Sequence, residues 1–143
     1  MIRISTKGRY ALRAMVDLAN HKAEEPVARS DIAHRQDISA DYVAQLFRSL
    51  QDVGLVEGVK GPGGGYRLGR SADRIRARDV IEAVEGPVVM APCIGDCEES
   101  ACPHTEHCPT RHLWEQLSNK IVEFLDSYTL ADLGEVAYPT EPT

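Results

Sequence analysis

Residues 38–68 read ISADYVAQLFRSLQDVGLVEGVKGPGGGYRL, a helix pattern followed at once by a hairpin pattern. Ser39 is a favoured helix N-cap, and the carboxylate of Asp41 suits the positive end of a helix. Four apolar residues then recur at helical spacing on one face: Val43, Leu46, Phe47 and Leu50. We therefore expect a helix over residues 39–52 that ends before Gly54.

Two short β-prone runs follow within residues 55–68, joined by four glycines and a proline. Glycine permits the backbone conformations of a tight turn, so this segment predicts a β-hairpin. A phosphate-binding glycine loop is the competing interpretation. The P-loop pattern is absent, however, and the loop does not lead into a helix.

Two amphipathic helices are expected before this segment, at residues 6–21 and 29–36, with a tight connection at 37–38. Helix, short helix, tight turn, helix and glycine-rich hairpin is the element order of a winged helix-turn-helix. The expected fold class is mostly α with a small β-hairpin.

The helix at 39–52 would read DNA, because the second helix of this motif enters the major groove. Gln45 can bond an adenine edge through two hydrogen bonds, whereas arginine and tyrosine can reach phosphate or base. The hairpin adds positive charge. The candidate DNA-binding residues are Ser39, Tyr42, Gln45, Arg48, Lys60 and Arg67.

Three regions are expected along the chain: a DNA-binding domain over 1–86 that ends with a short helix at 76–85, a cysteine-bearing loop over 87–110, and a long helix with a short tail over 111–143. The long helix has one broad apolar face: Leu113, Trp114, Leu117, Ile121, Phe124, Leu125 and Tyr128. This face packs either on its own domain or on the same helix of a second subunit, and we favour the dimer.

The formal net charge of the chain is −6, but it is unevenly distributed. Residues 1–78 hold 14 of the 16 Lys and Arg and 9 of the 22 Asp and Glu, a net charge of +5, whereas residues 79–143 carry −11. A basic first half can lie against phosphates while an acidic second half faces away, although ordinary surface charge gives the same numbers. With no membrane-spanning run and no signal peptide, we expect a cytoplasmic location.

Four cysteines lie within sixteen residues, in the spacing C-x3-C-x4-C-x5-C: Cys93, Cys97, Cys102 and Cys108. In a chain without an export signal, such a cluster favours metal binding or redox chemistry over disulfides. Thiolates suit both iron-sulfur clusters and zinc, but the paired C-x2-C of zinc ribbons is absent. Three histidines lie nearby, where a hydrogen-bonding role is more common than ligation: His104, His107 and His112. A Cys-His nucleophile would lack an oxyanion hole, so no enzyme activity is expected.

Three motifs together resemble the iron-sulfur cluster regulator (IscR) family: RISTKGRYA at 3–11, ISADYVAQLF at 38–47 and GPGGGY at 61–66. The similarity extends through the cysteine loop to CPTRHLW at 108–114 and covers nearly the whole chain. It implies a homodimeric winged-helix repressor or activator that binds a pseudo-palindromic operator in double-stranded DNA. Control would come from a bound iron-sulfur cluster, with 2Fe-2S favoured over 4Fe-4S.

The resemblance also assigns roles to single residues. It places Tyr42 and Gln45 at DNA-contacting positions, and Lys60 where relatives often carry a minor-groove arginine, for which lysine is a departure. It implies that three thiolates hold the cluster, with one further ligand still open. These candidate cluster ligands are Cys93, Cys102 and Cys108, with Cys97 or His112 beside them, because Arg111 occupies the place where relatives carry the fourth ligand.

The sequence therefore predicts a transcription regulator that senses iron-sulfur, redox or nitric oxide status through a cluster. The alternatives are a zinc-binding or metal-free winged-helix regulator, a protein-docking module of the same fold, and a small electron carrier. Operator footprinting distinguishes a regulator from a carrier, and the absorption spectrum distinguishes iron from zinc.

Overall fold

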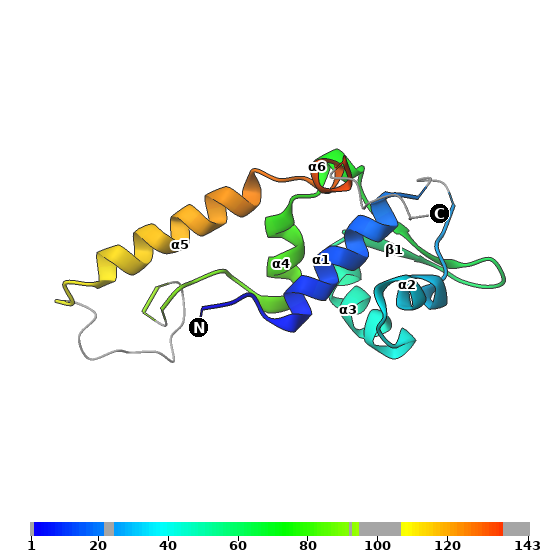
Figure 1. The fold of residues 1–143 in the computed structure, drawn as a ribbon, viewed down its shortest axis with the longest axis horizontal. Coiled ribbons are helices and arrows are strands. Elements are labelled where there is room, and N and C mark those ends of the chain that lie inside the picture. Colours follow the sequence, from blue (N-terminus) through cyan, green and yellow to red (C-terminus); the bar gives the residue numbers. More distant parts are fainter. Residues whose placement is uncertain (1, 22–24, 92, 95–106, 136–143) are drawn as a thin grey trace, which may run out of the picture.

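The computed structural model describes residues 2–21, 25–91, 93–94 and 107–135. Its elements in chain order are α1 (Thr6–Ala19), α2 (Arg29–Gln36), α3 (Ala40–Asp52), β1 (Val56–Val59), β2 (Gly65–Leu68), the 3-10 helix η1 (Ala72–Arg74), α4 (Ala77–Glu85), α5 (Arg111–Asp126) and α6 (Leu130–Glu135). The mostly helical fold with one hairpin is confirmed. The hairpin and α5 extend from opposite ends of the body (Figure 1). Among the described residues, no helix is long and apolar enough to cross a membrane.

The helix-turn-helix forms from α2 and α3. Asp37 ends α2 in the left-handed region (φ 56°, ψ 48°), a conformation that aspartate tolerates better than most residues and that turns the chain toward α3. The Ser39 hydroxyl then accepts the backbone N–H of Tyr42 at 3.0 Å, the expected N-cap. The apolar stripe of α3 is at most 1% exposed, and it forms the centre of the core: Val43, Leu46, Phe47 and Leu50.

The hairpin is antiparallel, with Val56 opposite Leu68, and it packs against the helical body. The Tyr66 ring meets Phe47 edge-on at 4.7 Å between ring centroids. Tyr66 also exchanges two backbone hydrogen bonds of 2.8 Å with Val27. A β-carbon on Gly65 would lie 2.1 Å from the Val27 carbonyl oxygen, so this close backbone approach requires glycine.

The start of α1 is held by the end of α4. Ser5 caps α1, and its hydroxyl donates to the Glu85 carboxylate. The same carboxylate accepts the Gly8 N–H at 3.3 Å, so a negative charge sits at the positive end of α1. Gly86, with φ 83°, ends α4 directly after Glu85 and leads toward the cysteine segment.

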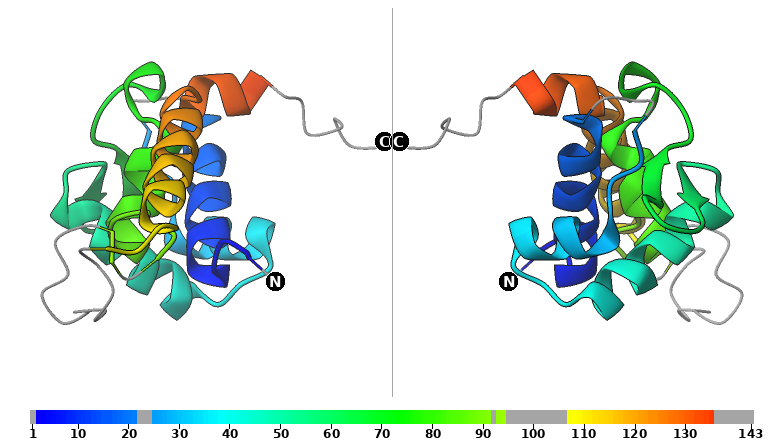
Figure 2. Two further views of the ribbon diagram at one scale, coloured as in Figure 1. Left: turned by 90° about the vertical axis from the view of Figure 1, so that its left-hand side faces the viewer. Right: turned by 90° about the vertical axis from the view of Figure 1, so that its right-hand side faces the viewer.

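The tail after α5 is partly helical, which was not expected from sequence. Thr129 and Asp132 cap each other: each backbone N–H donates to the other side chain, at 2.9 and 3.1 Å. The residues around them pair with the segment before α4, where Leu130 N–H donates to the Ile75 carbonyl at 2.9 Å. Leu130 is fully buried, and α6 lies against the end of α1 (Figure 2).

Leu130→Ala should therefore lower the free energy of unfolding by about 2–5 kcal/mol, because it leaves a cavity in the core. Urea unfolding followed by circular dichroism measures this loss. Val53→Ala is the matched control, since Val53 is 50% exposed and should cost little. Equal effects of the two variants would contradict a core role for α6.

Candidate functional site

The outward face of α3 presents the residues expected to read DNA. Ser39, Gln45 and Arg48 are exposed, and Tyr42 is half-buried. The Tyr42 ring meets the Tyr10 ring of α1 edge-on, with 6.0 Å between centroids and an interplanar angle of 86°. The first turn of α3 is thus fixed from behind, while its polar side chains face solvent.

A groove runs between the starts of α2 and α3 and the hairpin, with a volume of about 640 Å³. Lys60, expected from sequence, lines it together with Arg29 and Ser30 of α2. Arg29 and Ser30 were not among the residues expected from sequence to bind DNA. Their position at the start of the first helix of the motif is the feature that could have indicated them. Two cations and the single carboxylate of Asp41 give the groove a net positive lining, which suits a phosphate backbone.

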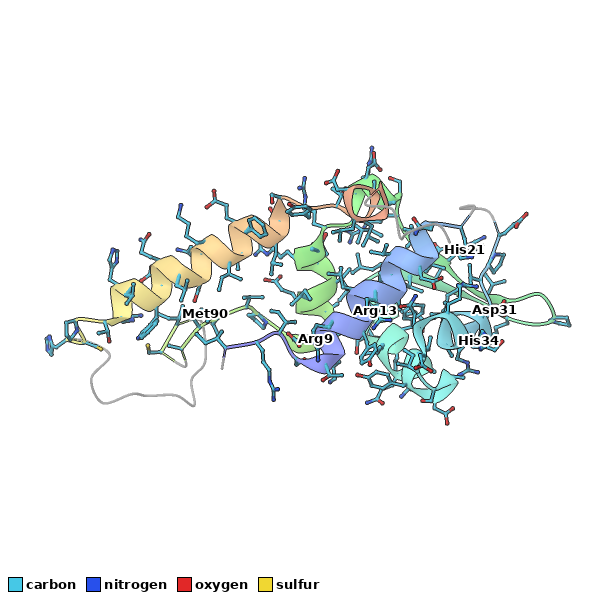
Figure 3. The ribbon with its side chains drawn as sticks, in the orientation of Figure 1. Arg9, Arg13, His21, Asp31, His34 and Met90 are labelled. Atoms are coloured by element: carbon cyan, nitrogen blue, oxygen red, sulfur yellow. The ribbon has the colours of Figure 1, made fainter. Side chains whose placement is uncertain are left out.

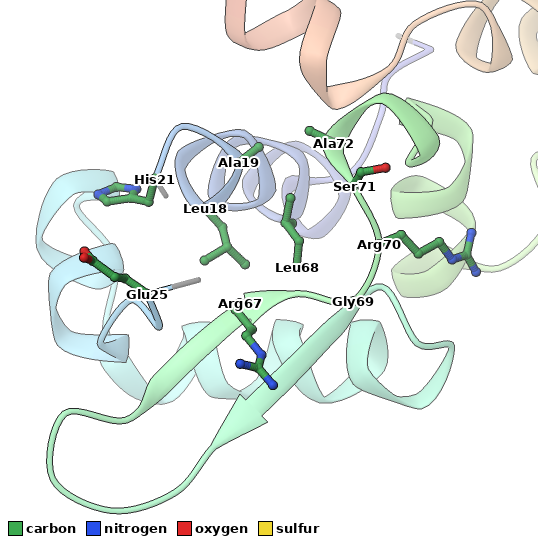
Figure 4. Close-up of a pocket in the computed structure, with 10 residues that line it drawn as sticks. All are labelled: Leu18, Ala19, His21, Glu25, Arg67, Leu68, Gly69, Arg70, Ser71 and Ala72. Carbon is green, nitrogen blue, oxygen red and sulfur yellow. The ribbon is translucent and has the colours of Figure 1, made fainter. Parts of the chain in front are cut away.

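Arg67 lies outside this groove. Its Nε donates to Glu57 Oε2 at 2.9 Å across the hairpin, so the guanidinium is already ion-paired in the free protein. It borders a separate pocket of about 390 Å³ between the end of α1, β2 and η1. Figure 4 shows Leu18 and Leu68 facing each other across this pocket, while the Arg67 side chain points away from it.

The structure describes Cys93 and Cys108, which lie on either side of the segment 95–106. Both are half-buried, and both are free thiols. His107 and His112 are exposed. The other candidates lie outside the described residues: Cys97, Cys102 and His104. Within the described residues alone, no three His, Cys, Asp or Glu side chains gather as a metal site.

The surroundings of Cys108 favour its thiolate. The Thr110 hydroxyl lies 3.1 Å from Cys108 Sγ, and this hydrogen bond lowers the pKa of the Cys108 thiol below its ordinary value. Hydrogen bonds from the backbone N–H groups of Thr110 and Arg111 act in the same direction. Since thiolate is the metal-binding form of cysteine, the donor chemistry fits a soft metal or a cluster. Thr110 was not expected from sequence.

The chain before Cys93 is attached to α5. The Met90 N–H donates to Ser118 Oγ at 2.9 Å, and the Ser118 hydroxyl donates to the Trp114 carbonyl at 2.8 Å. Ser118 is the one buried residue of α5. Figure 3 shows Met90 next to α5. The two ends of the cysteine segment are therefore joined to one helix, by this hydrogen bond and by direct chain continuity at Cys108.

The apolar face of α5 is only partly covered by the described part of its own chain. Leu113 is 57% exposed, Phe124 64% and Tyr128 41%. Within the described part of the chain, these three side chains are not packed onto their own domain.

A helix-turn-helix with a polar outward face, a glycine-rich wing and a positively lined groove between them are the features of a winged-helix DNA-binding regulator. Residues 4–135 match the model of the Rrf2 family, described as an iron-dependent transcriptional regulator. The chain belongs to the Rrf2 family of transcriptional regulators, and it is not an enzyme.

Similar proteins agree with this assignment. The chain is 47% identical over 132 residues to the HTH-type transcriptional regulator IscR of Erwinia tasmaniensis, covering 92% of this chain and 78% of the relative. Among solved structures it resembles CymR, the global cysteine regulator of B. subtilis, at 37% identity and a TM-score of 0.77, covering 96% and 99% of the two chains. It also resembles T. potens IscR at 36% identity and a TM-score of 0.76, covering 99% and 93%. The resemblance seen in the sequence motifs is confirmed.

Proposed function

We propose that this chain is an iron-sulfur cluster-dependent transcription regulator that acts in the cytoplasm as a homodimer on a pseudo-palindromic operator. It would sense iron-sulfur, redox or nitric oxide status. The observation that carries the proposal is the cysteine segment, which is joined to α5 at both ends in a chain whose relatives include proteins named IscR. The proposed regions are a DNA-binding domain at 1–86, the cysteine loop at 87–110, and the α5 region at 111–143.

In this proposal α3 enters the major groove. Gln45, together with Tyr42 and Ser39 in the first turn, reads base edges, because these side chains lie on the outward face near the start of the helix. Arg48 and Lys60 contact phosphates. Arg67 must first give up its ion pair with Glu57, so its contribution is smaller than that of Arg48 and Lys60, which have no carboxylate partner among the described residues.

Gln45→Ala should relax specificity at one base pair of each half-site by about 1–3 kcal/mol. Arg48→Ala is the matched comparison, since loss of a phosphate contact weakens all sequences about equally. Competition between single-base variants of a duplex selected by the wild-type chain measures both effects. If Gln45→Ala weakens every duplex alike, the base-reading role is wrong.

We propose that the partly covered apolar face of α5 pairs with the same face of a second copy. The exposed Leu113 and Phe124 are apolar, and a symmetric contact would remove both from water in each subunit. A dimer also supplies two reading helices, as a pseudo-palindromic operator requires.

Ile121→Glu should give monomers that bind DNA poorly, because a charge would lie in the apolar contact. The matched control is Asn119→Glu, because the Asn119 side chain is exposed and lies on the opposite side of α5, outside the contact. Sedimentation velocity measures the subunit number. A dimeric Ile121→Glu protein would contradict this role of α5.

The proposed cluster ligands are Cys93, Cys102 and Cys108, with Cys97 or His112 completing the set. When bound, the cluster would supply a group that changes with oxidation state, iron supply and nitric oxide. The chain itself provides the connection to DNA binding. Ser118 attaches the segment before Cys93 to α5 through the Met90 N–H. That segment begins directly after Glu85, whose carboxylate accepts hydrogen bonds from Ser5 and Gly8 at the start of α1.

Anaerobic purification followed by an absorption spectrum and iron and sulfide analysis tests the cluster. Substituting any of Cys93, Cys102 or Cys108 with alanine should abolish the visible chromophore, whereas Cys97→Ala should retain it if His112 completes the ligand set. A colourless Cys97→Ala with an intact Cys93→Ala would move the first ligand to Cys97. A wild-type protein with zinc alone would refute the cluster and leave the winged-helix regulator standing.

The similarity to CymR, named as a cysteine regulator, favours a second candidate: a regulator of the same fold that responds through its thiols without a cluster. Cys93 and Cys108 are free thiols, and the pKa of the latter is lowered. The same preparation separates the candidates. Iron and sulfide in stoichiometric amounts support the cluster, and their absence together with oxidation-dependent DNA binding supports the thiols.

A further inference from the structure

A buried polar network ties α1 to α2 behind the reading helix. Asp17 is 6% exposed, and both of its carboxylate oxygens accept hydrogen bonds from Arg35, at 2.8 and 2.9 Å. Gln36, also 6% exposed, donates its Nε2 to Asp17 Oδ2 at 2.8 Å. The Arg35 guanidinium therefore balances the negative charge of the Asp17 carboxylate, and both carboxylate oxygens accept hydrogen bonds.

This network fixes the direction of the Gln36 amide. A carboxylate only accepts hydrogen bonds, so the NH₂ of Gln36 must face Asp17, and its Oε1 faces the other way. That oxygen accepts Nε of Arg13 at 3.1 Å. The guanidinium of Arg13 also lies over the Tyr10 ring, with Cζ 5.3 Å from the ring centroid. Arg13 is thus held from two sides on the surface of α1 (Figure 3).

Arg13 stands beside the reading helix. The ring that it covers, Tyr10, is the ring that meets Tyr42 in the first turn of α3. One aromatic ring therefore separates the guanidinium from the face proposed to read bases. Because the major groove is about 12 Å wide, a side chain just outside a helix lying in it is positioned over the flanking phosphate backbone.

The charge of Arg13 is available. Arg35, Arg67 and Arg78 are ion-paired with Asp17, Glu57 and Glu82 respectively, at 2.8 to 3.1 Å. Within the described part of the chain, Arg13 has no carboxylate partner, and only its Nε is used in a hydrogen bond. Its two NH₂ groups form the planar fork that binds phosphate through two hydrogen bonds.

We infer that Arg13 is a phosphate-binding residue: its guanidinium, oriented by Gln36 and Tyr10, binds a backbone phosphate of DNA beside the groove that α3 enters. The inference rests on the proposed DNA-binding function. It adds α1 to the surfaces that contact DNA, and it gives the Asp17 network a role in positioning that contact.

The test uses the full chain and a DNA duplex that the wild-type chain selects from random sequence, titrated over a series of KCl concentrations. Arg13→Ala should weaken binding roughly tenfold, as expected for one charge-assisted contact. It should also reduce the slope of log affinity against log salt by about 0.9 for each bound copy. Arg13→Lys should keep most of the slope but bind less tightly, because lysine keeps the charge and lacks the fork.

Arg74→Ala is the matched control, since it removes the same charge from the exposed 3-10 helix η1 beside α6. It should leave the slope near that of wild type. A second readout replaces single phosphates with uncharged methylphosphonates. Wild type should lose affinity at the phosphate that flanks the groove, and Arg13→Ala should lose none there. Thermal unfolding of Arg13→Lys and Arg13→Ala confirms that both variants are folded.

If Arg13→Ala keeps the wild-type slope and the wild-type sensitivity to methylphosphonates, the phosphate role of Arg13 is refuted while DNA binding stands. An effect of Arg74→Ala as large as that of Arg13→Ala also refutes it, because general charge would then explain both. If the wild-type chain selects no duplex at all, the proposed function itself fails.

Discussion

The edge-on contact between Phe47 and Tyr66 fixes the geometry on which the DNA-facing surface depends. Phe47 is fully buried at the centre of α3, and Tyr66 lies in β2 of the wing. The contact therefore sets how the reading helix and the wing lie relative to each other. Two backbone hydrogen bonds between Tyr66 and Val27, one donated by each residue, attach the chain just before α2 to the same wing. The groove lined by Arg29 and Lys60 is a consequence of these contacts, because its walls are the elements that they join.

The polar contacts connect the cysteine segment with the rest of the chain. Ser118, the one buried residue of α5, accepts the Met90 N–H. Glu85, at the root of the same segment, holds Ser5 and Gly8 at the start of α1. A change in the segment that displaced either contact would move an element of the DNA-binding half or of α5. Regulation of DNA affinity requires that a change at one site alters the arrangement of the DNA-binding elements, and these contacts connect the two regions.

The fold alone does not identify the signal. The chain is about equally similar in structure to the cysteine regulator CymR and to an IscR, with TM-scores of 0.77 and 0.76. One scaffold therefore serves regulators with different names, and the distinction must come from side chains grafted onto it. We propose that in this chain those side chains are the closely spaced cysteines, because thiolates are suitable ligands for a cluster.

The sequence by itself determined the elements with strong local signals. The stripe of α3, its Ser39 cap and the glycine-rich turn predicted the helix-turn-helix and the wing, because helical period, capping and turn formation depend on neighbouring residues. Tertiary structure decided what depends on distant residues. Helix α6 has too few residues to show a period, and Leu130 is buried only because the segment around Ile75 and the end of α1 meet it. The Arg67–Glu57 ion pair and the orientation of Arg13 likewise arise where separate elements pack together, since no local pattern encodes which side chains will meet.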